Sequence, residues 1–176
     1  MRKFVLTYGL IAGAIMSALM LLPLPFQDQL GFDKGVIVGY ASMVAAFLMV
    51  YFGVRAYRDA TPDGRVSFGR AFGVGLLITI VATSCYVATW EVIYYKLSPD
   101  FGEKFAAAAA AQARASGASE AAIAQRLQEV AEFRVQYDKP LVNIAYTFLE
   151  PLPVGLLFTV LTAWLISRKR RDGAVA

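Results

Sequence analysis

Four long apolar runs dominate the 176-residue chain, at residues 4–22, 36–54, 71–95 and 141–166. Each is long enough to cross the hydrocarbon core of a bilayer as an α-helix, which takes about 20 residues. The first two runs contain no charged residue, and each of the other two contains one carboxylate. Because backbone polar groups in lipid must be satisfied within the spanning segment, these runs predict an all-α fold, an integral membrane four-helix bundle.

The composition agrees with one membrane-embedded unit over residues 1–176. Apolar residues make up 58% of the chain and charged residues 17%, and the mean hydropathy is +0.54, which excludes an ordinary soluble domain. The net charge is +4, but the basic residues stand mainly at the ends of the apolar runs and form no base-reading face. We therefore expect the lipid bilayer, and no nucleic acid, as a partner.

Charge in the short connections predicts the orientation. The segment 55–70 holds four arginines and two aspartates, and positive charges follow the last run at 168–171. Connections rich in Lys and Arg stay on the cytoplasmic side. We expect the bacterial cytoplasmic (inner) membrane, with the N- and C-termini in the cytoplasm and residues 98–139 outside.

The segment 98–139 is polar and predicts an extracytoplasmic helical hairpin between the third and fourth spans. Ser98-Pro99-Asp100 supplies residues that favour a helix start, and an alanine-rich stretch follows. The helix is expected to break at 116–119 and to restart with an apolar face, and the alternative is one long bent helix. The face consists of Ile123, Leu127, Val130 and Tyr137. This spacing needs an apolar partner, either within the protein or in another one.

Small residues recur at four-residue intervals in three of the runs. They are Gly9, Gly13 and Ser17 in the first run, Gly75, Thr79 and Thr83 in the third, and Pro151 and Gly155 in the fourth. Such a strip lies along one face of a helix and allows another membrane helix to approach closely. We interpret these residues as helix-packing positions.

Two acids lie within the runs, and each has a structural and a functional interpretation. An acid in the hydrocarbon is costly and usually faces protein, water or a partner. Glu150 is either a proton- or cation-handling group or a structural acid bonded to hydroxyl or backbone groups. Glu91 lies near the outer end of its run, where it can reach interfacial water or Lys96.

The sequence gives no sign of an enzyme, a cofactor site or a metal site. It contains no histidine, which excludes the imidazole metal site, the Ser-His-Asp triad and the Cys-His pair. The single cysteine, Cys85, lies within the third run and can form no intrachain disulfide. Glu91 and Glu150 could serve as an acid–base pair only if the fold brought them together.

Several stretches resemble a family of uncharacterised bacterial multi-pass membrane proteins, grouped as a domain of unknown function. They are Lys3-Phe4-Val5-Leu6-Thr7-Tyr8-Gly9-Leu10-Ile11-Ala12-Gly13, Phe52-Gly53-Val54-Arg55-Ala56-Tyr57-Arg58-Asp59, Ser67-Phe68-Gly69-Arg70-Ala71-Phe72, Phe148-Leu149-Glu150-Pro151-Leu152-Pro153-Val154-Gly155 and the basic tail. The resemblance implies a four-helix membrane protein and supplies no activity, cofactor or site.

Two functions fit these features. The first is a structural, binding or assembly protein that presents the outer hairpin, with a membrane-protein partner or a second copy. The alternative is a small oligomeric carrier of protons or of a small solute that uses Glu150, because four spans enclose too little space for a pathway in one chain.

Overall fold

The computed structural model describes residues 1–117 and 119–168, and for residues 27–33 only the backbone. The described residues form helices and no strand, so the all-α prediction is confirmed. The elements are α1 (Arg2–Leu21), η1 (Leu24–Phe26), α2 (Gln27–Asp59), α3 (Phe68–Val92), η2 (Ile93–Leu97), α4 (Phe101–Ala115), α5 (Glu120–Tyr137), α6 (Pro140–Leu149) and α7 (Leu152–Ser167). The basic tail beyond Arg168 lies outside the described residues.

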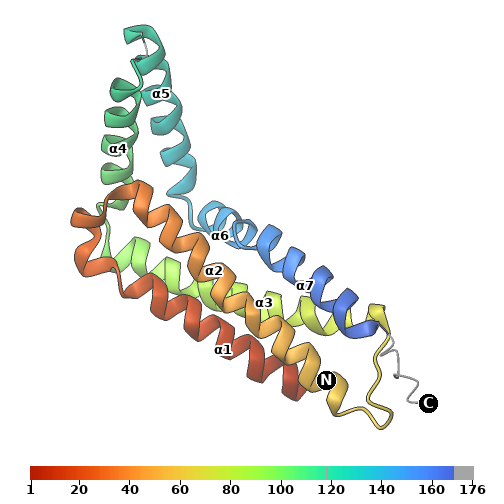
Figure 1. Ribbon diagram of the computed structural model, residues 1–176. Helices are drawn as coiled ribbons and strands as arrows, with labels where there is room; N and C mark the ends of the chain where they lie inside the picture. Colours follow the sequence, from red (N-terminus) through yellow and green to blue (C-terminus); the bar gives the residue numbers. More distant parts are fainter. Residues whose placement is uncertain (118, 169–176) are drawn as a thin grey trace.

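Four helical stretches of the described chain are long and apolar enough to cross a membrane. They are Arg2–Phe26, Lys34–Asp59, Phe68–Leu97 and Pro140–Ser167. They pack together as a bundle, and α4 and α5 project from one end of it (Figure 1). The N-terminus and the connection between α2 and α3 lie at the opposite end. The protein is therefore a multi-pass membrane protein, and the side that each end faces stays a prediction.

The second helix is longer than its apolar run predicts. The apolar run begins at Val36, but only η1 separates α1 from α2, which already begins at Gln27. Pro23 and Pro25 lie in this short turn, and no proline follows them within α2 to stop the helix. Apolarity marks the part of a helix that lies in lipid, and a helix can continue beyond it in polar sequence.

The fourth span is interrupted, although residues 141–166 read as one run. The α6 helix ends at Leu149 and α7 begins at Leu152. Pro151 and Pro153 have no N–H, so the helical hydrogen bonds that these positions would donate are missing. Backbone bonding resumes with the Gly155 N–H, which donates to the Pro151 carbonyl over 2.9 Å. The interruption places Glu150 at a helix junction.

The small strip of α1 lies against α3. A Cβ added to Gly9 would be 2.7 Å from Cβ of Val81, and one added to Gly13 would be 2.5 Å from Cβ of Cys85. One turn further along, the Ser17 and Thr89 hydroxyl oxygens are 2.7 Å apart and share a hydrogen bond. The backbone of α1 therefore lies directly against side chains of α3, with no room for a Cβ at either glycine.

The small strip of α3 lies against α7. A Cβ on Gly155 would be 2.4 Å from Cγ2 of Thr79, and one on Gly75 would be 3.1 Å from Cγ2 of Thr159. The hydroxyls of Thr79 and Thr159 form a buried hydrogen bond of 3.1 Å. Two further strip positions, Thr83 and Pro151, are also fully buried.

The helices α4 and α5 lie side by side (Figure 1). Gly117 follows α4 with φ 71°, a left-handed conformation that glycine adopts without strain, and Ser119 caps α5 by accepting the Ala122 N–H. On the expected apolar face, Ile123 and Val130 are buried. Leu127 and Tyr137 are half-buried.

Candidate ligand-binding cavity

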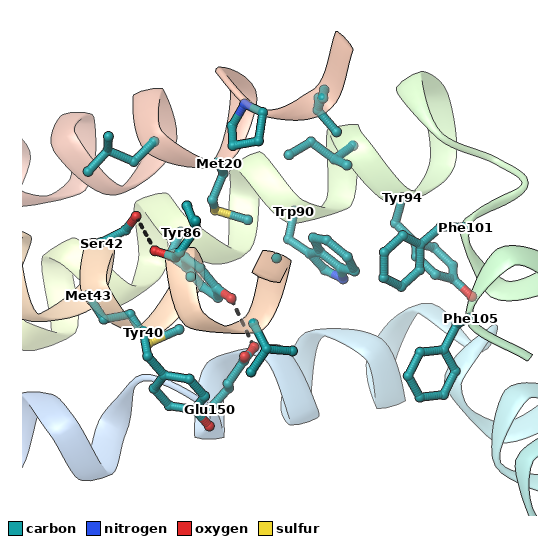
Figure 2. Close-up of a pocket in the computed structure, with 18 of the residues that line it drawn as sticks. Met20, Tyr40, Ser42, Met43, Tyr86, Trp90, Tyr94, Phe101, Phe105 and Glu150 are labelled. Atoms are coloured by element: carbon teal, nitrogen blue, oxygen red, sulfur yellow. Dashed lines mark hydrogen bonds between the residues drawn. The ribbon is translucent and has the colours of Figure 1, made fainter. Parts of the chain in front are cut away.

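A cavity of about 430 Å³ lies where the bundle meets α4 and α5. Its volume falls within the range of small-molecule sites. All four spans contribute to it, together with α4 and α5. The lining side chains include Met16, Met20, Tyr40, Ser42, Met43, Tyr86, Trp90, Tyr94, Phe101, Phe105, Phe133, Arg134, Tyr137 and Glu150, and Figure 2 shows ten of them labelled.

Aromatic rings form much of the wall. In α3 and η2 they recur every fourth residue at Tyr86, Trp90 and Tyr94, which places them on one helical face. Phe101 of α4 meets the Trp90 ring edge-on, with centroids 5.0 Å apart. Tyr137 of α5 meets Tyr94 edge-on at 5.5 Å. Rigid rings of this kind give a ligand a large contact area at a low cost in conformational entropy.

Three methionines complete the apolar surface. Met16 and Met20 come from α1, and Met43 comes from α2. Methionine side chains are unbranched and polarizable, so they adapt to ligands of irregular shape. The cavity thus combines a rigid aromatic wall with an adaptable one.

Glu150 supplies an acidic group to the cavity. The Tyr86 hydroxyl donates to Oε2 of Glu150 over 2.9 Å (Figure 2). Tyr86 is buried, whereas Glu150 is exposed. In the described part of the chain no Lys or Arg forms an ion pair with this carboxylate. Its negative charge is therefore available to a ligand.

The cavity reaches the side of the bundle at α2 and at the α6–α7 junction, where two of its lining residues are exposed. Tyr40 of α2 and Glu150 at the junction both line the cavity, and both are accessible from outside the protein. The α6 helix packs against α3 and α5. A ligand dissolved in the surrounding membrane could enter by this route.

Polar bonds among the aromatic residues hold α5 in place. Trp90 Nε1–H donates to the Tyr137 hydroxyl over 3.0 Å, and that hydroxyl lies 3.2 Å from the Thr147 hydroxyl oxygen. Tyr94 donates to a carboxylate oxygen of Asp138. Burial raises the pKa of Tyr137 above its ordinary value, so its hydroxyl stays neutral. These contacts position the ring of Tyr137 in the cavity wall.

A sequence model of the family described as "Protein of unknown function (DUF4199)" matches residues 7–168. The chain belongs to this family. No curated protein and no solved structure matches the chain. The family match covers α1 from Thr7 onward and all the later described helices, α4 and α5 included. Because the family description assigns no activity, the function has to be argued from the site.

The structure separates the two acids that the sequence analysis singled out. Glu150 lines the cavity and Glu91 does not. Oε1 of Glu91 is buried and has no hydrogen-bond partner among the described residues. The described residues contain no ion pair between Glu91 and Lys96, the contact that the sequence allowed. The DUF4199 cavity therefore contains one of these two acids, and they do not share a site.

Sequence reasoning did not identify the aromatic cavity, although a signal for it was present. Aromatic pairs at a spacing of four recur as Phe101 and Phe105 in α4 and as Phe133 and Tyr137 in α5. Each such pair lies on one face of its helix. Trp90 and Tyr94 lie near the end of an apolar run, where aromatic residues gather at a membrane interface, and such a position does not require them to face each other or a ligand. In the described chain no group of three Cys, Asp or Glu side chains is placed to hold a metal ion.

Proposed function

We propose that this DUF4199 protein is a membrane-embedded binding protein that holds a hydrophobic ligand in the cavity. The observation that carries this proposal is an apolar, aromatic-lined space of about 430 Å³, with the Glu150 carboxylate at its opening as the one acidic group among the lining residues that the structure describes. Ligand sites in proteins combine an apolar wall with a few polar groups that orient the ligand.

The position of α4 and α5 supports ligand binding over presentation of a docking surface. Both helices turn aromatic side chains toward the cavity, from α4 through Phe101 and Phe105 and from α5 through Phe133 and Tyr137. Their role in this proposal is to complete the cavity wall. A second copy or a membrane-protein partner is not required for binding.

The same residues support binding without catalysis. The Ser42 hydroxyl, which lines the cavity, donates to the Val38 carbonyl over 2.6 Å and thus bonds within its own helix. A nucleophile needs an adjacent general base to become reactive. We propose that Glu150 orients a ligand and performs no acid–base chemistry.

A carrier is the second candidate, and the carboxylate of Glu150 in an open cavity is the observation that favours it. Transport also needs a path to the other side of the membrane. Toward the opposite end, the space between the helices is filled by fully buried side chains, among them Phe47, Val50 and Ile78. A carrier would have to move these helices apart or use a second copy, so binding is the better supported function.

We propose a bacterial inner-membrane location with cytoplasmic termini and with α4 and α5 outside. The arginine-rich segment 55–70, which runs from the end of α2 to the start of α3, lies at the bundle end away from α4 and α5, and this supports the orientation. Single cysteines at Asp63 and Ser116, both exposed, test it in a Cys85→Ala background. An impermeant maleimide applied to whole cells should label Ser116→Cys only. Labelling of Asp63→Cys alone would show that the protein has the opposite orientation.

Filling the cavity tests the binding function. Gly39 lines the cavity, and a Cβ added there meets no atom within 4 Å, so Gly39→Phe adds a ring without a backbone clash. Gly73 is the matched control, because a Cβ there also meets open space and the residue does not line the cavity. The neutral probe is triphenylphosphine oxide, added to protein in dodecyl maltoside.

The readout is the fluorescence of Trp90, isolated by Trp164→Phe. We expect the Trp90 fluorescence to change saturably with probe concentration in the parent protein and in the control Gly73→Phe. Gly39→Phe should show no saturable change. Partition of the probe into detergent is common to all variants and cancels in the comparison. An equal, unsaturable change in all three proteins would refute ligand binding in the cavity.

A further inference from the structure

We infer that the cavity selects hydrophobic cations, namely onium groups carried on an apolar body. This inference rests on the proposed binding function and specifies its ligand. The observation behind it is a carboxylate that forms no ion pair with any described Lys or Arg, beside aromatic rings at a lateral opening of an apolar cavity.

The charges that line the cavity favour a cation over an anion. Arg134 also lines it, but its guanidinium is 3.5 Å from Glu103 and 3.9 Å from Asp138 at the nearest atoms. Those two carboxylates compensate the arginine. Glu150 has only the neutral Tyr86 hydroxyl as a partner in the described chain. An incoming cation would therefore gain an attraction that an anion of the same shape would lack.

The aromatic wall suits a weakly hydrated cation. The hydrogen bond holds the Tyr86 ring next to the Glu150 carboxylate, and Trp90 follows one turn along the same helical face. Aromatic faces attract cations, and protein sites for quaternary ammonium groups are built from such rings. A compact, strongly hydrated ion would lose more hydration energy on entering this apolar space.

The lateral opening indicates an apolar body. Tyr40 and Glu150 frame an entrance on the side of the bundle, and the methionines Met16, Met20 and Met43 line the space behind it. A cation that dissolves in the membrane can reach this entrance. The shared chemistry is that of a free hydrophobic onium ion or of the ammonium headgroup of a phospholipid.

Tetraphenylphosphonium tests the inference against two comparison probes, neutral triphenylphosphine oxide and the anion tetraphenylborate. Binding is followed by Trp90 fluorescence in dodecyl maltoside, in the Trp164→Phe background. We expect the cation to bind at least about tenfold more tightly than either comparison probe, a difference that corresponds to about 1.4 kcal/mol.

Glu150→Gln removes the charge and keeps an acceptor for Tyr86. It should weaken phosphonium binding about tenfold or more and leave the neutral probe unaffected, which also shows that the variant is folded. Glu91→Gln is the matched control, because Glu91 is the other acid within the membrane-spanning runs and does not line the cavity. Its phosphonium affinity should stay within about twofold of the parent value.

The failures of the two proposals are distinguishable. If Gly39→Phe blocks the neutral probe but the cation binds no more tightly and Glu150→Gln changes nothing, the cation inference is overturned and the binding function stands. If the binding of no probe is affected by Gly39→Phe, both proposals are overturned.

Where phosphonium does bind, a soluble short-chain phosphatidylcholine identifies the natural source of the cation. Displacement of bound phosphonium supports a phospholipid headgroup, and no displacement supports a free hydrophobic cation.

Discussion

The two halves of α3 serve different purposes. In its first half, Gly75 and Thr79 lie against α7 so closely that a methyl group added to the facing Gly155 would overlap Thr79. In its second half, Tyr86 and Trp90 line a cavity of about 430 Å³. The second half of α3 also packs closely against α1 through Cys85 and Thr89, so the open space lies only on the face that carries Tyr86 and Trp90.

The difference follows from the size of the residues at a constant four-residue spacing. Small residues let two backbones approach until no space remains between them, and in lipid this dispersion contact is a main source of helix association. Large rings keep neighbouring helices apart, and a space remains where their shapes do not interlock. Stability should therefore depend most on the first half of α3 and ligand binding on the second.

The largest expected effect comes from Gly155→Ala in the tight half. The new Cβ would lie 2.4 Å from Thr79 Cγ2 and 3.0 Å from the Phe47 ring, so the helices must separate. We expect the free energy of unfolding to fall by about 2 to 3 kcal/mol. Unfolding in mixed micelles of dodecyl maltoside and dodecyl sulfate measures it. Gly73→Ala, which meets open space, should be neutral or stabilising by up to about 1 kcal/mol.

The next effect concerns the cavity half, where Tyr137→Phe removes a hydroxyl that bonds to Trp90 and Thr147. We expect a loss of about 1 to 2 kcal/mol, because both partners lose a bond in a partly buried place. Amide exchange in α5 should also become faster. Tyr146→Phe is the control, since its ring meets Phe133 and its hydroxyl forms no hydrogen bond in the described chain. Equal losses of unfolding free energy in Tyr137→Phe and Tyr146→Phe would show that the Tyr137 hydroxyl does not stabilise the fold.

A smaller effect is expected for Thr79→Val, which keeps the shape of the tight contact and removes its hydrogen bond to Thr159. Hydrogen bonds between membrane helices contribute about 0.6 kcal/mol on average, and we expect a loss of that size in the same unfolding assay. Ser84→Ala should cost less, because the Ser84 hydroxyl bonds to the Ile80 carbonyl within α3. A loss above that of Gly155→Ala would show that polar bonding, and not close approach, dominates the tight half.

The smallest effect is a pH dependence at the start of α4. Lys104 holds the pKa of Asp100 below its ordinary value. The carboxylate therefore stabilises the folded segment above the unfolded pKa of about 3.9, and this contribution is lost as the pH falls through the lower folded pKa. Amide exchange in α4 should become faster over that acid range, and Asp100→Asn should abolish the change. If the pH dependence of amide exchange in α4 persisted in Asp100→Asn, another titrating group would be responsible for it.

Local features of the sequence were sufficient to predict the four spans. The lengths of the apolar runs determine the spans, because the bilayer sets the length that a helix must cover. The spacing of Gly9, Gly13 and Ser17 predicts a smooth face, because a helix returns to the same side after about four residues. The structure places that face against α3.

Only the tertiary structure decided which faces leave a space between them. The prolines at 151 and 153 are visible in the sequence, but the direction in which the broken helix turns Glu150 depends on the packing of α6 against α3 and α5. The cavity requires side chains from α1 to α5 and from the α6–α7 junction to meet without interlocking. Spacing within a run reports which residues share a face, whereas the volume between faces depends on residues far apart in the chain. For that reason the sequence predicted an acid within the membrane, and the fold determined that Glu150, and not Glu91, lies at the opening of an aromatic cavity.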